Sequence, residues 1–155
     1  HGYQLHASPN HPKSRGEITL NSSDPYDYPK ILFNYLKEEE DLKQTRECIH
    51  VARKILSQPA LAEHAGDEVG PGFDAQSDDE LNEYIRSKAD TAYHPCGTCK
   101  MGVDDMAVVD QDLKVNGIGN LRVIDASVIP EIPSANLNAP TLMIAEKGSE
   151  AILNN

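Results

Sequence analysis

The sequence has 155 residues, of which 14 are Lys or Arg and 25 are Asp or Glu, so its net charge of −11 argues against sequence-independent binding to nucleic acid. Apolar residues make up 39% of the chain, and no run approaches the roughly 18 consecutive apolar residues that span a bilayer. The three cysteines do not form the framework of a secreted disulfide protein, so we expect a cytoplasmic protein and leave open a membrane association through residues beyond this sequence.

The first elements in the chain are two extended segments followed by a helix. Residues 17–20 and 30–36 are rich in β-branched, apolar and aromatic side chains, and residues 21–25 between them favour a bend, which predicts two strands of an antiparallel sheet. From about Glu38 the period changes, and Pro59 closes a helix. Its buried face is expected from residues at spacings of three and four, namely Leu42, Thr45, Ile49, Ala52 and Leu56.

A loop and a second helix come next. Residues 66–75 hold three glycines and a proline with little periodicity, which is typical of a loop. Ser77 precedes Glu80 by three residues, the spacing of a capping box at a helix N-terminus. We expect that helix to end near Ala89 and to bury Leu81, Tyr84 and Ile85.

Turns and short β segments dominate beyond Thr91. The run 121–124 is apolar enough for a buried strand. Residues 140–153 predict a final helix, with a proline in its first turn and Asn138 near its cap. The fold class is therefore α+β, with a lobe of sheet and helices before about residue 90 and a different lobe after it.

The densest cluster of reactive side chains lies between Tyr93 and Gly102 and includes Cys96 and Cys99. A structural zinc site needs four ligands, and Cys48, the third cysteine, has no second ligand at metal spacing, so we predict no metal site. The cluster contains the Pro-Cys-x-x-Cys half of the zinc deaminase signature, but its His-x-Glu half is missing. A dithiol redox pair stays open.

For two further side chains a functional and a structural role compete. Most single histidines are structural, but Pro95 and Gly97 favour a tight turn that would project the imidazole of His94 outward. Asp125 follows the predicted strand, at a position where ligands bind in α/β folds, or else it caps a turn. The residues alone leave both alternatives open.

Five segments, taken in order, resemble the C-terminal part of the glucose-methanol-choline (GMC) oxidoreductases, flavoproteins that oxidise alcohols with FAD. They are residues 12–20, 34–36, 94–102, 121–130 and 138–146. Within that family, 94–102 and 136–139 look most like the subgroup of choline dehydrogenases and bacterial alcohol dehydrogenases.

The resemblance implies part of a substrate-binding lobe over residues 1–93, built on an antiparallel sheet. Residues 94–155 would carry the catalytic histidine and return to an FAD-binding lobe. By the family pattern, His94 is the base near the substrate hydroxyl and Asn138 is its partner. Contacts to the FAD chain and to the pyrimidine edge of its ring are expected from Asp125, Ala126, Ala139, Pro140 and Thr141.

The full Gly-x-Gly-x-x-Gly turn that holds the FAD pyrophosphate is absent from the 155 residues, and the sequence begins at His1 without a Met. We therefore expect a C-terminal fragment that alone neither holds FAD nor turns over. Its expected partners are a small-molecule alcohol, an electron acceptor that the sequence does not identify, and the N-terminal remainder of its own polypeptide. Two alternatives stay open, a non-catalytic binding or assembly module of the same fold and a thiol oxidoreductase that uses Cys96 and Cys99.

Overall fold

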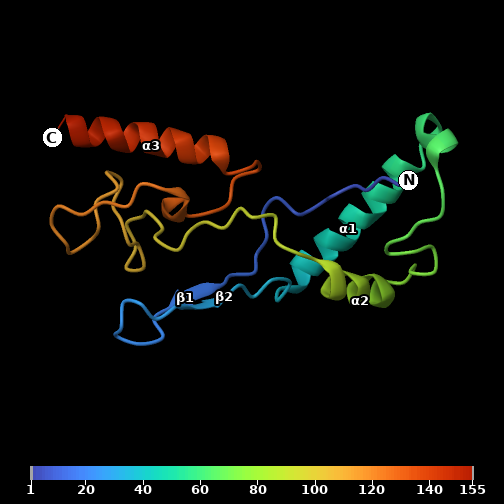
Figure 1. Ribbon diagram of the computed structural model, residues 1–155, viewed down its shortest axis with the longest axis horizontal. Coiled ribbons are helices and arrows are strands. Elements are labelled where there is room, and N and C mark those ends of the chain that lie inside the picture. Colours follow the sequence, from blue (N-terminus) through green and yellow to red (C-terminus); the bar gives the residue numbers. More distant parts are fainter. Residues whose placement is uncertain (1, 155) are drawn as a thin grey trace. The chain divides into compact units, whose positions relative to one another are not determined.

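The computed structural model describes residues 2–154, which form helices joined by long irregular segments and a small sheet (Figure 1). His1 lies outside the described residues. The chain divides into two compact units, the first containing the residues up to Gly16 and Leu32–Asp90, and the second containing Glu17–Ile31 and the residues from Thr91 onward. The mixture of helices with a small sheet agrees with the predicted α+β class. What each unit binds, and thus the division into a substrate lobe over 1–93 and an FAD lobe segment over 94–155, stays a prediction.

The two predicted strands form and pair with each other. β1 spans Glu17–Thr19 and β2 spans Lys30–Leu32. β2 is shorter than expected because Asn34 and Leu36 have φ angles of 55° and 57°, a left-handed conformation that breaks an extended strand.

The first unit is held together by its two long helices. α1 spans Glu39–Leu56 and α2 spans Asp78–Lys88, and the two pack against each other (Figure 1). Leu42 of α1 and Leu81 and Ile85 of α2 are the most buried apolar side chains of the two helices, each no more than 2% exposed. Both predicted helices therefore form, with Leu42, Leu81 and Ile85 buried as expected and the other residues of the two predicted faces half-buried, namely Thr45, Ile49, Ala52, Leu56 and Tyr84.

The helix ends also match their sequence signals. Ser77 caps α2: its hydroxyl accepts a hydrogen bond from the Glu80 backbone N–H, and the Glu80 carboxylate accepts one from the Ser77 N–H. This is the predicted capping box, which satisfies two donors that would otherwise lack partners. α1 ends before Pro59, which starts the short 3₁₀ helix η1, Pro59–His64.

Asp41 is a buried carboxylate in the first turn of α1, only 1% exposed. Its two oxygens accept hydrogen bonds from the backbone N–H groups of Lys13 (2.6 Å) and Ser14 (2.7 Å). Burial by itself raises the pKa of the Asp41 carboxyl, but the hydrogen bonds from Lys13 and Ser14 outweigh it and hold that pKa below its ordinary value of 3.8. One side chain thus ties the N-terminal segment to α1.

Arg53 of α1 holds the loop predicted over residues 66–75, which forms neither helix nor strand. Its guanidinium pairs with the Glu68 carboxylate at 3.0 Å and donates to the backbone carbonyls of Gly72 (2.9 Å) and Ala75 (3.0 Å). The planar fork of an arginine suits several acceptors at once.

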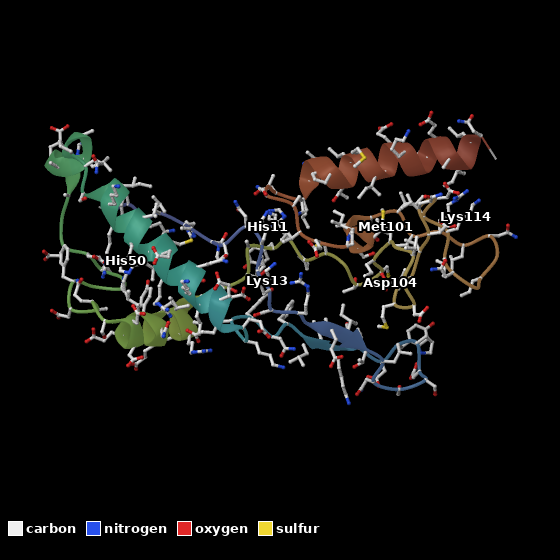
Figure 2. All side chains as sticks on the ribbon, turned by 180° about the vertical axis from the view of Figure 1, so that it is seen from behind. His11, Lys13, His50, Met101, Asp104 and Lys114 are labelled. Atoms are coloured by element: carbon white, nitrogen blue, oxygen red, sulfur yellow. The ribbon has the colours of Figure 1, made fainter. Side chains whose placement is uncertain are left out.

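The second unit is built on short segments that run beside one another. The backbone N–H of Cys99 donates to Ser127 O (3.0 Å), and that of Met101, labelled in Figure 2, donates to Val128 O (2.8 Å). Residues 127 and 128 belong to the 3₁₀ helix η2, Ala126–Val128, on which α3 packs. The core consists of Val109, Leu113, Val128, Ile129, Leu137 and Ile144.

The prediction of a buried strand over 121–124 is wrong. Arg122 makes a single isolated bridge, to Lys114, and Leu121 is 46% exposed. An apolar run becomes a strand only when a neighbouring segment pairs along its length, and here the hydrogen bonds to residues 113–115 do not extend into a ladder.

The last helix, α3, spans Asn138–Leu153, and so begins two residues before the predicted Pro140. Its Gly148 is buried against Ile124: a Cβ at position 148 would lie 2.5 Å from Ile124 Cγ2 and 2.8 Å from Ile124 Cδ1. Among residues 2–154 there is no helix whose length and hydropathy would allow it to span a bilayer.

Asp41→Asn should lower the unfolding free energy of the 155-residue chain by about 3 kcal/mol at pH 7, since hydrogen bonds to a charged acceptor are lost. The folded pKa of Asp41 lies below 3.8, so its stabilisation is complete above the unfolded pKa and is lost as pH falls through the folded pKa. Urea denaturation monitored by circular dichroism at several pH values between 7 and 3 should show the difference in unfolding free energy between Asp41→Asn and wild type becoming smaller as the pH falls. The exposed Asp67→Asn is the control, and a difference from wild type that does not narrow at all between pH 7 and pH 3 would contradict the assignment.

Gly148→Ala should destabilise the chain by about 1 to 3 kcal/mol through overpacking, although Ala in a helix interior normally gains about 1 kcal/mol over Gly. Removing the opposing side chain with Ile124→Ala should make Gly148→Ala neutral or stabilising, because the clash is gone. Urea denaturation of the two single variants and the double variant measures this coupling. A stabilising effect of Gly148→Ala alone would show that Ile124 does not restrict this position.

Candidate active site

The backbone around His94 has restricted conformations at positions 93, 95 and 97. Tyr93 has φ of 61° and Gly97 has φ of 87°, and Pro95 lies between them with its restricted φ. A Cβ at Gly97 would lie 3.3 Å from the carbonyl oxygen of Ile129, so glycine serves both the left-handed conformation and the close approach. Residues 93–97, here called the His94 turn, are thus constrained at three positions, although the structure has a bend at Tyr93 and its nearest hydrogen-bonded turn at residues 98 and 99, not at Pro95 and Gly97 as expected.

This turn places His94 in an open pocket of about 370 Å³ within the second unit. The pocket is formed by the turn, by η2 and by the start of α3, with the lining residues Tyr93, His94, Pro95, Ala126, Leu137, Asn138 and Thr141. The structure thus brings together His94, Asn138, Ala126 and Thr141, four residues expected at the site from separate segments of the sequence.

Three other expected residues, Asp125, Ala139 and Pro140, are not part of this lining. The Asp125 carboxylate accepts hydrogen bonds from the Ser127 N–H (2.8 Å) and from the Ser127 hydroxyl (2.5 Å), and so caps η2. This is the structural alternative of the sequence analysis, and it fixes the helix that carries Ala126 into the pocket. A contact between Asp125 and a cofactor stays a prediction.

Sequence reasoning missed three lining residues, Tyr93, Pro95 and Leu137. Each directly precedes or follows a predicted site residue, and this adjacency in sequence could have indicated that they line the same pocket. Leu137 is 4% exposed and belongs to the core of the unit, so it anchors the neighbouring Asn138. Tyr93 is 76% exposed and adds an aromatic ring to the pocket.

The two side chains of the pocket best suited to proton transfer and hydrogen bonding, those of His94 and Asn138, have no hydrogen-bond partner among the described residues. Within residues 2–154, neither the His94 imidazole nor the Asn138 amide hydrogen-bonds to another group of the chain. The lining contains no carboxylate and no Lys or Arg. The pocket can therefore offer a ligand one imidazole, which can donate or accept a hydrogen bond, and one amide, which can do the same.

The start of α3 adds backbone donors beside the pocket. Leu137 occupies the N-cap position without a side-chain cap, and the first turn carries no acidic residue. The Thr141 N–H donates to Leu137 O (2.9 Å), and Pro140 has no N–H, which leaves the amides of Asn138 and Ala139 without an acceptor in the helix. Such a helix start suits an anionic or electron-rich group.

The cysteines form no disulfide with one another. Cys96 and Cys99 are half-buried thiols in the segment that follows His94, and burial raises the pKa of the Cys48 thiol in α1. In the part of the chain that the structure describes, no group of three or more His, Cys, Asp or Glu side chains could hold a metal ion.

Comparison with known proteins gives a family match over most of the chain. The model of the family described as "GMC oxidoreductase" matches residues 12–145. The chain is similar to the oxygen-dependent choline dehydrogenase of Klebsiella pneumoniae subsp. pneumoniae, with 51% identity over 152 residues, or 98% of this chain. It is also 50% identical over its whole length to the oxygen-dependent choline dehydrogenase of Photobacterium profundum.

The solved structures give a similar result. The chain resembles part of the pyridoxine 4-oxidase from Mesorbium loti, with a TM-score of 0.88 and 33% identity over 94% of this chain. In each case the chain accounts for a minor part of the larger protein: 27% and 28% of the two dehydrogenases and 28% of the oxidase.

Gly97→Ala should destabilise the chain more than Gly117→Ala, its matched control. Both glycines have positive φ, but a Cβ at Gly117 meets nothing within 4 Å, so Gly117→Ala costs only the left-handed conformation, about 1 kcal/mol. Gly97→Ala adds the approach to Ile129 O and should cost about 1 kcal/mol more. Urea denaturation compares the two variants, and equal losses would mean that the Ile129 carbonyl does not constrain the turn.

Proposed function

The chain belongs to the GMC oxidoreductase family, and from this premise we propose that it forms the C-terminal part of an FAD-dependent enzyme that oxidises a primary alcohol, with His94 as the catalytic base. The observation that carries the proposal is the pocket itself, where the imidazole of His94 and the amide of Asn138 have no protein partner among the described residues. Polar side chains without partners in a shared pocket are available to a substrate.

His94 takes the proton of the substrate hydroxyl. Removal of this proton makes the carbinol C–H bond a better hydride donor, and an imidazole is suited to accept it near neutral pH. FAD, when bound, supplies the acceptor for the hydride. Apart from the Tyr93 phenol, His94 is the one side chain of this lining that can act as an acid or a base, and an imidazole accepts a proton far more readily than a phenol does.

Asn138 stabilises the oxygen that loses the proton. Its side-chain N–H donates a hydrogen bond to the developing alkoxide, and one such donor is worth on the order of 3 kcal/mol in the oxyanion holes of acyl-transfer enzymes. Asn138 is the first residue of α3, and the preceding Leu137 is packed in the core. Its position therefore depends on the packing of the whole unit.

The residues near the start of α3 fit an electron-rich ring edge of FAD. The amides of Asn138 and Ala139 lack acceptors in the helix, and the first turn has no acidic side chain that would repel negative charge. We propose that these donors and the adjoining Pro140 and Thr141 contact the ring, and that Asp125 and Ala126 contact the FAD chain. The pyrophosphate would be held by residues outside this sequence, which lacks the glycine-rich turn.

Choline is the first substrate to test, because the similar dehydrogenases carry that name. The pocket lining supplies one aromatic ring, Tyr93, and no carboxylate. A quaternary ammonium binds best against several aromatic faces, so its other contacts would come from outside this chain. The same names make O₂ the first electron acceptor to test.

The proposal predicts that His94→Ala slows flavin reduction by roughly two to four powers of ten, the usual contribution of a positioned base, while FAD stays bound. Asn138→Ala should cost less, about 100-fold, because it removes one donor and leaves the base. The protein for this test carries the present chain in place of the matching C-terminal residues of the Klebsiella pneumoniae relative, which are 51% identical. Stopped-flow reduction by choline gives the rate, and the flavin absorbance gives the FAD content.

The matched control is His50→Ala, which removes an exposed imidazole on α1 (Figure 2) and should leave the rate unchanged. Near wild-type reduction by the His94 variant with FAD fully loaded would reject His94 as the base. A loss of FAD in both histidine variants would instead point to general instability of the grafted protein.

A further inference from the structure

Within residues 2–154, the backbone on either side of His94 is the structure that directs its imidazole. A catalytic histidine is commonly oriented by a hydrogen bond to its second ring nitrogen. Within residues 2–154 the His94 ring has no such bond. The side chain therefore points where the preceding and following residues aim it.

The residues that follow His94 are constrained by covalent structure and packing. Pro95 restricts its own φ and the conformation of the residue before it. Gly97 has a positive φ and lies close to Ile129 O. This side of the turn is therefore constrained by its backbone.

The side that precedes His94 depends on a hydroxyl. Tyr93 has φ of 61°, a conformation that costs a bulky residue about 1 to 2 kcal/mol. Its backbone N–H donates to the Thr91 Oγ1 at 3.0 Å, the bond of a Ser/Thr turn, which replaces a backbone turn. The Tyr93 ring is 76% exposed, so packing of the ring in this chain does not explain the strained backbone.

We infer that Thr91 is a positioning residue: its hydroxyl, by accepting the Tyr93 N–H at 3.0 Å, holds the backbone in the left-handed conformation that aims His94 into the pocket. This inference rests on the proposed role of His94 as base. It adds a residue that lies outside the pocket lining and touches neither substrate nor cofactor in the proposal. Its effect on the reaction passes through the direction of one imidazole.

The test uses the grafted flavoprotein with Thr91→Val, which keeps the branched shape and removes the hydroxyl, and Thr91→Ser, which keeps the hydroxyl. Thr91→Val should slow flavin reduction by about 10- to 100-fold, as expected when a reacting group is displaced by roughly 1 Å, with FAD content unchanged. Thr91→Ser should restore the rate to within about 3-fold of wild type because the Ser/Thr turn is kept.

The double variant separates positioning from general damage. In a His94→Ala background, Thr91→Val should cause no further loss, because the group on which it acts is gone. An equal loss in both backgrounds would overturn the inference. The inference would also be overturned if Thr91→Val alone reduced the flavin at the wild-type rate while His94→Ala reduced it slowly. If His94→Ala itself reduces the flavin at the wild-type rate, the proposed function is rejected, because His94 is then not the base.

A readout independent of turnover is the NMR spectrum of the 155-residue chain with ¹³C-labelled histidine. The chain has six histidines, and the His94 resonance is the one lost in His94→Ala. Thr91→Val should shift or broaden that resonance and leave the other histidines in place, while Thr91→Ser should not. An unmoved His94 resonance in Thr91→Val would overturn the inference.

Discussion

The backbone hydrogen bonds between residues 99–101 and residues 127–128 are the constraint on which the second unit depends. They join Cys99 to Ser127 and Met101 to Val128, and Val128 is completely buried in the core beneath them. Because these bonds lie just after the His94 turn and within η2, they fix both walls of the pocket at once. The packing of α3 on η2 then brings Asn138 to the same place. The geometry of the pocket thus arises from main-chain pairing between segments too short to form a sheet.

Elements whose causes are local could be predicted from the sequence. The Ser77–Glu80 capping box and the apolar spacing of α1 need only residues a few positions apart, and both appear in the structure as expected. The strand over 121–124 could not be judged in this way, because an extended run needs a pairing partner, and its neighbour bridges only Arg122. The burial of Asp41 also depends on Lys13 and Ser14, whose positions no local pattern specifies.

The candidate site shows the same division between local and long-range causes. The resemblance supplied His94 and Asn138 as separate segments, and their presence in one pocket required the core around Leu137 and Val128. Asp125 shows what the sequence could not decide, because an aspartate after an apolar run can either contact a ligand or cap a turn. In the structure its carboxylate accepts hydrogen bonds from Ser127 and so forms a cap. Thr91 escaped sequence reasoning because a Thr two residues before a Tyr is ordinary until the left-handed φ of Tyr93 is seen.

Arg53 has a consequence for how this fold can vary. It holds the loop over residues 66–75 through one carboxylate, that of Glu68, and through the main-chain carbonyls of Gly72 and Ala75. A carbonyl is the same whatever side chain its residue carries, so the anchor tolerates substitution at Ala75, whereas the φ of 96° at Gly72 favours glycine there for a separate reason. Val69, fully exposed, is equally unconstrained by the anchor. Mutations can therefore accumulate on the surface of this loop, and change what it meets, without releasing the loop from α1.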